Sequence, residues 1–196
     1  MTAAAAMLHD FPARSALLEY LRREQSPSGA WSAYWWPDAE YASALAYEAL
    51  YDVRATAECC PADQGRLEAA SRWAASRVGS DGAVHTSLDP TGSPFATACA
   101  LRMLAKSARR DETDGALYRG LSWLMASQKP DGSWQRTARM RIPPYDMVDP
   151  SLKVDWGRDG RGDHSIGTIV VDTHALFTTA TVVQALLTWL ETAEPQ

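Results

Sequence analysis

The sequence of 196 residues predicts an all-α protein made of three consecutive helical hairpins. A glycine turn recurs along the chain, with its central residue at Gly29, Gly82 and Gly132, and each turn lies between two segments that have the apolar spacing of helices. The second segment of every pair also repeats one ten-residue frame. A period of about 50 residues is typical of repeat architectures, in which stacked copies of one unit bury a shared core.

Apolar residues at helical spacing predict about six main helices, with these approximate bounds: 12–25, 41–51, 65–77, 95–107, 114–128 and 176–191. Each turn glycine follows the end of the first helix of its pair, where a left-handed backbone is favoured and glycine has no Cβ to clash. The pairs form repeats at about 12–53, 64–108 and 114–192, and the length fits one domain over residues 1–196.

The three second helices share a frame that begins with an aromatic residue at Tyr41, Phe95 and Phe177. A small residue, a hydroxyl residue and an alanine follow, and leucine occupies the tenth place. Small residues near the start of a helix allow neighbouring helices to approach closely. The first helices instead carry a bulky aromatic residue nine places before the turn glycine. We therefore expect the second helices to form an inner layer and the first helices an outer layer.

The composition argues against a nucleic-acid partner and against a membrane span. Lys and Arg total 19 against 24 Asp and Glu, which gives a net charge of −5, and no helix carries a sustained basic stripe. Residues 1–7 form a short alanine-rich run without a basic segment, and no apolar run approaches the roughly 18 residues of a membrane span. The expected location is cytoplasmic. Cys59, Cys60 and Cys99 lack the spacing of a zinc site, and no cofactor is predicted.

The third turn reads Gln128-Lys129-Pro130-Asp131-Gly132-Ser133-Trp134. This stretch resembles the QW motif of squalene–hopene cyclases and of the wider terpenoid cyclase and protein prenyltransferase superfamily. The paired outer and inner helices with such a turn between them fit the α/α toroid of that superfamily over about residues 12–191. A complete toroid has about six hairpins, so the chain resembles one half of a barrel.

Two features set the chain apart from complete members of that superfamily. An open half-barrel exposes an apolar concavity, which soluble monomers rarely tolerate, so we expect pairing with a second copy or with a related half-toroid chain. The proton-donating DxDD box that the resemblance implies is missing, because Val171-Asp172-Thr173-His174 holds a single aspartate at the comparable place. The diphosphate-binding DDxxD box is missing as well.

A long insertion separates the third turn from its inner helix. From the turn glycine to the inner-helix aromatic residue, the first two copies take 12 and 13 residues and the third takes 45. We expect the extra stretch, at 136–173, to be a loop that orders as a lid over the concave end of the barrel. Asp155, Asp159 and Asp163 are spaced four apart, but intervening glycines favour a solvated loop over a metal site.

Acidic residues precede all three inner helices and ring the mouth of the expected concavity. Asp38 and Glu40 precede the first, Asp89 the second, and Asp172 with His174 the third. A carboxyl group buried there has its pKa raised towards the range of a general acid or base, and a histidine needs little shift to serve. Our catalytic candidates are Asp38, Glu40, Asp172 and His174, with a helix N-cap as the alternative role for Asp172.

The substrate-binding candidates are aromatic residues near the first inner helix and residues of the insertion. Desolvated aromatic faces stabilise positive charge by roughly 0.5–2 kcal/mol each, with ordinary packing as the alternative. Guanidinium groups suit phosphate, sulfate or carboxylate, with solvated loop arginines as the alternative. The full set is Tyr34, Trp35, Trp36, Tyr41, Arg139, Arg141, Tyr145, Trp156 and Arg158.

These observations predict a half-toroid subunit of a ring-forming enzyme in specialised metabolism. The reaction would be an intramolecular cyclisation of a small molecule, by acid/base or leaving-group chemistry, in a cavity completed by a homo- or hetero-oligomeric partner. Two alternatives remain open. One is a non-catalytic subunit that binds a hydrophobic ligand or supports a catalytic partner, which the missing acid box favours. The other is a class II-type terpene cyclase with a non-standard acid.

Overall fold

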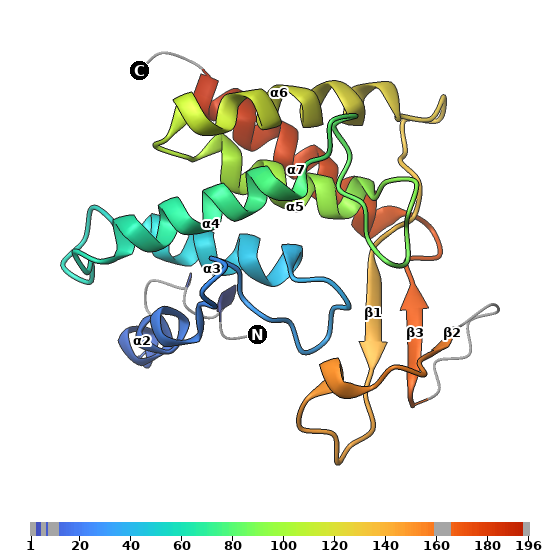
Figure 1. Ribbon diagram of the computed structural model, residues 1–196, viewed down its shortest axis with the longest axis horizontal. Helices are drawn as coiled ribbons and strands as arrows, with labels where there is room; N and C mark the ends of the chain where they lie inside the picture. The colour runs from blue at the N-terminus through green and yellow to red at the C-terminus, as the bar shows by residue number, and fades with distance from the viewer. Residues whose placement is uncertain (1–2, 5–6, 8–11, 159–165, 194–196) are drawn as a thin grey trace.

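The computed structural model describes residues 3–4, 7, 12–158 and 166–193. Six main helices lie in these ranges, and Figure 1 labels them: α2 (Arg14–Glu24), α3 (Glu40–Asp52), α4 (Asp63–Arg77), α5 (Pro94–Ala105), α6 (Arg110–Ala126) and α7 (Leu176–Ala193). The all-α class and the three hairpins are therefore confirmed. Helix α6 begins earlier than predicted, because Asp111 and Glu112 lie in its first turn, where carboxylates interact favourably with the helix dipole.

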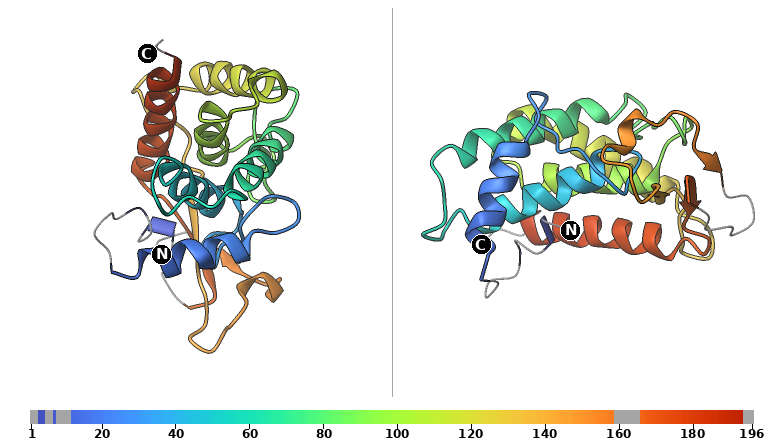
Figure 2. Two further views of the ribbon diagram at one scale, coloured as in Figure 1. Left: turned by 90° about the vertical axis from the view of Figure 1, so that its left-hand side faces the viewer. Right: turned by 90° about the horizontal axis from the view of Figure 1, so that it is seen from below.

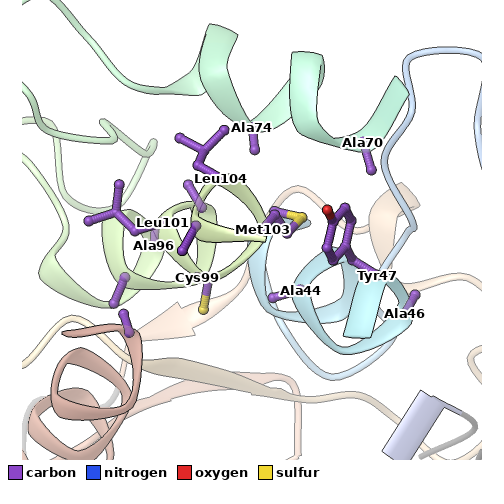
Figure 3. Packing of buried hydrophobic residues seen from close by; sticks show 14 of the residues in the cluster. Ala44, Ala46, Tyr47, Ala70, Ala74, Ala96, Cys99, Leu101, Met103 and Leu104 are labelled. Atoms are coloured by element: carbon purple, nitrogen blue, oxygen red, sulfur yellow. The ribbon is translucent and has the colours of Figure 1, made fainter. Parts of the chain in front are cut away.

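The helices form the two expected layers. Every residue of α5 is buried, and this helix packs against α3, α4, α6 and α7, so it lies at the centre of the bundle (Figure 2). Helices α3, α5 and α7 form the inner layer, and α2, α4 and α6 lie outside it (Figure 1). Small side chains make the close packing possible: Figure 3 shows Ala70 and Ala74 of α4 facing Tyr47 of α3 and Met103 of α5.

The turns are structural joints with one repeated geometry. Gly29, Gly82 and Gly132 have φ angles of +96°, +94° and +83°, in the region that favours glycine. The tryptophans that follow two of these glycines are 3% exposed, and their indole N–H groups donate at 2.7 Å to carbonyl groups of the preceding outer helix. Trp31 and Trp134 therefore tie each turn to its own helix.

The hydroxyl residue of the frame also has a structural role. Ser43 and Thr97 accept backbone N–H groups from the residue two places after the turn glycine, at 2.9 and 2.8 Å. Thr179 accepts the equivalent N–H group at 3.4 Å. The same hydrogen bond recurs at all three joints, which explains why a hydroxyl residue recurs at the third place of the frame.

The insertion contains a small sheet, where the sequence predicted a loop. Strands β1 (Arg139–Ile142) and β3 (Thr168–Val171) pair antiparallel, with Arg139 opposite Val171, and β2 (Gly157–Arg158) pairs parallel with β3, in the order β1-β3-β2. A 3-10 helix covers Pro150–Leu152. The strands are very short and distant in sequence, which is why periodicity did not reveal them. The sheet lies at the N-terminal ends of the inner helices (Figure 1).

Within the described part of the chain, no helix combines the length and the apolar character needed to cross a membrane.

Candidate functional site

An aromatic cluster lies where the N-terminal ends of the three inner helices meet. Tyr41, Phe95 and Phe177 come from the first place of the frame, and their ring centroids are 5.7, 5.7 and 5.8 Å apart. Trp36, from the loop before α3, packs against all three rings at 4.5, 5.1 and 5.4 Å. We call these four side chains the aromatic quartet. One repeated aromatic place thus builds a compact wall at one end of the inner layer.

Asp38 lies beside the aromatic quartet on the loop that enters α3. Burial raises the pKa of its carboxyl group to about 6, the charge of Glu40 acts in the same direction, and Arg77 opposes them. Glu40 is 2% exposed and accepts a hydrogen bond from Arg77 Nε at 2.7 Å. Because Glu40 engages this guanidinium group, Asp38 has no ion pair among the described residues.

A small cavity lies between Asp38 and three rings of the quartet. Its volume is about 10 Å³, and its walls include Asp38, Trp36, Tyr41 and Phe95. A cavity of this size holds about one water molecule. Glu40 and Arg139 also line this space, so Asp38 borders a cavity with both aromatic and charged walls. Partial burial there favours the protonated form of its carboxyl group.

The concave face continues along the inner helices and encloses about 280 Å³. Residues from the first, fifth and eighth places of the frame line it, because these places share one side of a helix. The eighth place is polar in every copy, with Glu48 on α3, Arg102 on α5 and Gln184 on α7. Arg102 Nε donates to Glu48 Oε1 at 2.8 Å, and both side chains are buried. The cavity therefore has an aromatic end and a polar end.

The candidates before α7 have different surroundings. Asp172 Oδ2 accepts the backbone N–H group of Thr178 at 2.8 Å, in the first turn of α7, so the carboxylate caps this helix. His174 is exposed and lines a surface depression of about 640 Å³ together with Lys129 and Arg136. The structure thus brings Asp38 and Glu40 together and places His174 in a separate depression.

The aromatic candidates fall into two groups. Tyr34 and Trp35 line a cleft of about 450 Å³ between α2 and α3, to which Trp36 and Tyr41 also belong. The Tyr34 hydroxyl group donates to the Met147 carbonyl group at 2.7 Å, which fastens the loop before α3 to the insertion.

The other two aromatic candidates lie on the insertion itself. Tyr145 is 96% exposed. Trp156 lies under the guanidinium group of Arg141, 5.8 Å from ring centroid to Cζ, and under Lys153 Nζ at 5.7 Å. Trp156 is therefore a cation–π partner of basic residues in the structure.

The arginine candidates are already engaged where they are described. Arg139 Nε donates to Asp89 Oδ2 at 3.1 Å, and Asp89 is 5% exposed. Arg141 is buried, its guanidinium group donates to the Ala33 carbonyl group, and burial lowers its pKa. Arg158 belongs to β2, and its side chain lies outside the described part.

The described residues contain no group of three or more His, Cys, Asp or Glu side chains arranged to hold a metal ion. Asp159 and Asp163, two of the acids weighed for a metal site, lie outside the described ranges. Cys59, Cys60 and Cys99 are free cysteines. Burial raises the pKa of the Cys99 thiol to about 12. A thiol with such a pKa is a poor nucleophile at neutral pH.

Sequence reasoning missed five residues of this site: Glu48, Phe95, Arg102, Phe177 and Gln184. The signal was present in the repeated frame, since the first place is always aromatic and the eighth is always polar. The frame alone does not say which side of each inner helix faces the other two. Places that repeat in three inner helices converge on one axis, and this convergence is the signal for a shared site.

Fold and site together define a partial α/α toroid of the terpenoid-cyclase type, with a concave inner face. The squalene–hopene cyclase C-terminal domain family matches residues 1–141, and the chain belongs to this family. The resemblance read from the turn motif is therefore confirmed.

Three relatives show how far the similarity extends. Drimenyl diphosphate synthase from Streptomyces showdoensis is 35% identical over 144 residues, which is 69% of this chain and 26% of that protein. The crystal structure of a protein from Actinoplanes has a TM-score of 0.87 and 45% identity, over 96% of this chain and 54% of the other. The type II terpene cyclase MstE from Scytonema has a TM-score of 0.85 and 38% identity, over 97% of this chain and 55% of MstE.

The chain thus spans about half the length of these solved structures and a smaller share of the curated relative. MstE structures have also been solved with geranylgeranyl dihydroxybenzoate, the substrate, and with merosterolic acid A, the product.

Proposed function

We propose that this chain is part of a terpenoid cyclase that closes rings on a polyprenyl chain, with Asp38 as the proton donor. The observation that carries the proposal is the Asp38 carboxyl group, whose pKa is raised to about 6, in one small cavity with three rings of the aromatic quartet, Trp36, Tyr41 and Phe95. The similarity to terpene cyclases, among them one crystallised with a geranylgeranyl substrate, supports the substrate class.

The chemistry uses the proton and the ring faces in turn. The Asp38 O–H bond breaks as its proton adds to one carbon of a terminal C=C bond, which leaves positive charge on the other carbon. The π electrons of a second double bond then form the ring C–C bond, and loss of a proton from carbon ends the reaction. The quartet rings stabilise the cation by roughly 0.5–2 kcal/mol each. Solvent returns a proton to Asp38.

The two ends of the concave face orient the substrate. The eighth place of the frame lies seven residues beyond the first, which is about 10 Å along a helix. A hydrocarbon chain between them would place its terminal alkene at the quartet and its polar head near Glu48, Arg102 and Gln184. Arg139, Arg141 and Arg158 belong to the insertion at the opposite, aromatic end. Arg139 is paired with Asp89 and Arg141 donates to the Ala33 carbonyl group, so binding of an anionic group by any of these arginines is a separate proposal from this orientation.

The proposed cavity is incomplete in this chain. Helix α7 exposes Leu176, Val183, Leu187 and Leu190 by 43 to 73%, so the concave face is open on that side. Further helical repeats, from a partner or from additional chain, would cover it, in line with the greater length of the relatives.

The test is Asp38→Asn in the complete protein, assayed with geranylgeranyl dihydroxybenzoate and geranylgeranyl diphosphate by mass spectrometry of the products. General acids typically contribute about 10²–10⁴-fold, so turnover should fall at least 100-fold. Asp52→Asn, at the exposed far end of α3, is the matched control and should keep full activity. Full activity of Asp38→Asn would refute the assignment, and loss on Asp172→Asn or His174→Ala alone would move the acid to the α7 entrance.

A second candidate function is binding without chemistry. The missing DxDD box favours it. It predicts that geranylgeranyl dihydroxybenzoate binds to the folded protein and is recovered unchanged, and that Asp38→Asn leaves this affinity intact.

A further inference from the structure

We propose that Cys59 and Cys60 are a redox-active dithiol, which a hydroperoxide oxidises to a disulfide, and that this disulfide loosens the docking of helix α2. The inference goes beyond the proposed function and does not depend on it. Both cysteines lie in the loop between α3 and α4, at the opposite end of the bundle from the small sheet (Figure 1). All residues of this loop, 53–62, belong to the described part of the chain.

The two thiols are free and reachable from solvent. Cys59 is exposed and Cys60 is partly exposed, whereas Cys99 is buried on α5. Cys59 Sγ lies 3.8 Å from the Cys60 carbonyl oxygen, to which it is a weak donor, so this thiol is turned towards the neighbouring residue. Because the two cysteines share one peptide bond, they remain neighbours in every conformation of the loop.

A disulfide between these residues would be strained and therefore readily reversed. Disulfides usually join Cα atoms about 4.4–6.8 Å apart, whereas a trans peptide holds neighbouring Cα atoms about 3.8 Å apart. Strained disulfides have more oxidising potentials and are typical of labile or regulatory bonds. The pair suits a bond that forms and is reduced again, and it does not suit a permanent crosslink.

The oxidation balances with one hydroperoxide. The Cys59 thiolate, on the more exposed residue, attacks a peroxide oxygen, the O–O bond breaks, and an alcohol leaves as a sulfenic acid forms. The Cys60 sulfur then attacks the Cys59 sulfur, the S–O bond breaks, and water leaves. Two electrons pass from the sulfur atoms to the peroxide, and the two thiol protons end in the alcohol and the water.

The dithiol is bracketed by contacts to one buried ion pair. Arg22 of α2 donates from Nε to Asp63 Oδ1 at 3.0 Å and from Nη2 to Asp63 Oδ2 at 2.8 Å, and Asp63 is 1% exposed. Arg22 Nη2 also donates to the Glu58 carbonyl group at 2.7 Å. The Cys60 N–H group donates to Asp63 Oδ2 at 3.0 Å, and the Asp63 N–H group donates to the Cys60 carbonyl group at 2.8 Å. The backbone on both sides of Cys59 is thus held by the pair that ties α2 to α4.

The residue before the dithiol also holds the other end of α2. The Glu58 carboxylate accepts a hydrogen bond from the Arg14 guanidinium group, and the Ser15 hydroxyl group donates to Glu58 Oε1 at 3.0 Å. Arg14 and Ser15 belong to the first turn of α2, and Arg22 belongs to its last turn. The loop that carries the dithiol therefore contacts α2 at both ends.

Disulfide formation would disturb these contacts directly. The small ring that it closes contains the peptide bond between Cys59 and Cys60, so this peptide has to rotate and the Cys60 N–H group turns away from Asp63. A buried carboxylate that loses a hydrogen bond loses part of what offsets its desolvation. Because Asp63 is the partner of Arg22, the docking of α2 weakens when the disulfide forms.

The first experiment detects the disulfide in the full chain by mass spectrometry. After treatment with hydrogen peroxide, trypsin releases both cysteines on the peptide 55–66, which should be about 2 Da lighter and regain this mass with a thiol reductant. Cys99→Ala is the matched control and should form the same disulfide, because Cys99 is buried. Cys59→Ser and Cys60→Ser should instead gain about 16 or 32 Da, as sulfenic or sulfinic acid. A wild-type peptide that gains oxygen without losing two hydrogens, or a disulfide between two chains, would overturn the proposal.

A trivalent arsenical tests the pairing of the thiols without oxidation. Phenylarsine oxide binds two thiols at once, so the reduced wild-type chain should retain it through a wash with a monothiol. Cys59→Ser and Cys60→Ser should each lose this retention, and Cys99→Ala should keep it. Retention by both single variants, or none by the wild type, would count against a dithiol at this place.

Hydrogen exchange tests the consequence for α2. The amides of α2 should exchange at least about tenfold faster in the oxidised chain than in the reduced chain, with α5 unchanged. In Asp63→Asn the α2 amides should already exchange fast in the reduced state, and oxidation should add little. A disulfide that leaves α2 exchange unchanged, or that speeds α5 equally, would refute the coupling. Neither mass nor exchange is measured with a substrate, so both results stand whether or not Asp38 is the acid.

Discussion

Helices α5 and α7 are built on one sequence frame and end in opposite environments. All twelve residues of α5 are buried, whereas α7 exposes four large aliphatic side chains by 43 to 73%. The difference is one of neighbours, because α5 has an inner helix on each side and α7 has one on a single side among the described residues. The comparison teaches that the frame carries apolar residues for a packing partner on every inner helix, and that α7 carries them without such a partner among the described residues.

The largest expected contrast lies at the eighth place of the frame. Arg102→Met should lower the free energy of unfolding by about 3–5 kcal/mol, because it leaves the buried Glu48 carboxylate unpaired. Gln184→Met, at the same place on exposed α7, should change it by less than about 0.5 kcal/mol. Urea unfolding measures both. The double change Glu48→Leu with Arg102→Met should regain most of the loss, and its failure to do so would show that the pair is not the cause.

Core packing should give the next contrast. Leu101 of α5 is fully buried and fills the space that Gly120 leaves on α6, so Leu101→Ala should cost about 2–5 kcal/mol. Leu187 on α7 is 53% exposed, so Leu187→Ala should cost less than about 0.5 kcal/mol. Thermal unfolding of the two variants makes the comparison, and equal losses would mean that the Leu187 side chain is buried in solution.

Replacing the aspartate before α3 and replacing the one before α7 should change the free energy of unfolding in opposite directions. The pKa of Asp38 is raised from 3.8 to about 6 in the folded chain, so ionisation above pH 6 opposes folding. Asp38→Asn should therefore stabilise the protein at pH 8 by up to about 3 kcal/mol, and the gain should shrink as the pH falls from 6 towards 4. Asp172→Ala should instead destabilise by about 1 kcal/mol through loss of the cap. A pH-independent effect of Asp38→Asn would contradict the burial argument.

The smallest contrast concerns the hydroxyl place of the frame. Thr97 is buried and accepts the Val84 N–H group at 2.8 Å, so Thr97→Val should cost about 1–2 kcal/mol. Thr179 is partly exposed and its bond to Trp134 is 3.4 Å long, so Thr179→Val should cost about 0.5 kcal/mol. Chemical denaturation measures the stability loss of each variant. An equal or larger loss for Thr179→Val would mean that the third joint is as tight as the second.

The helices were predictable because their apolar spacing, their glycine turns and their repeated frame all agree. The strands were not, since Thr168–Val171 is a short apolar run whose partner, Arg139–Ile142, is far away in sequence and carries two arginines. Asp38 could be found from its place before an inner helix. The pairing of Glu48 with Arg102 could not, because it depends on how closely α3 and α5 approach.

The aromatic quartet takes one ring from each of the three repeats, so it forms only when all three inner helices have docked. Trp36 packs against Tyr41, Phe95 and Phe177 at 4.5, 5.1 and 5.4 Å. Its indole ring is therefore a natural reporter of folding, since loss of any one repeat from the bundle would change the surroundings of the same side chain.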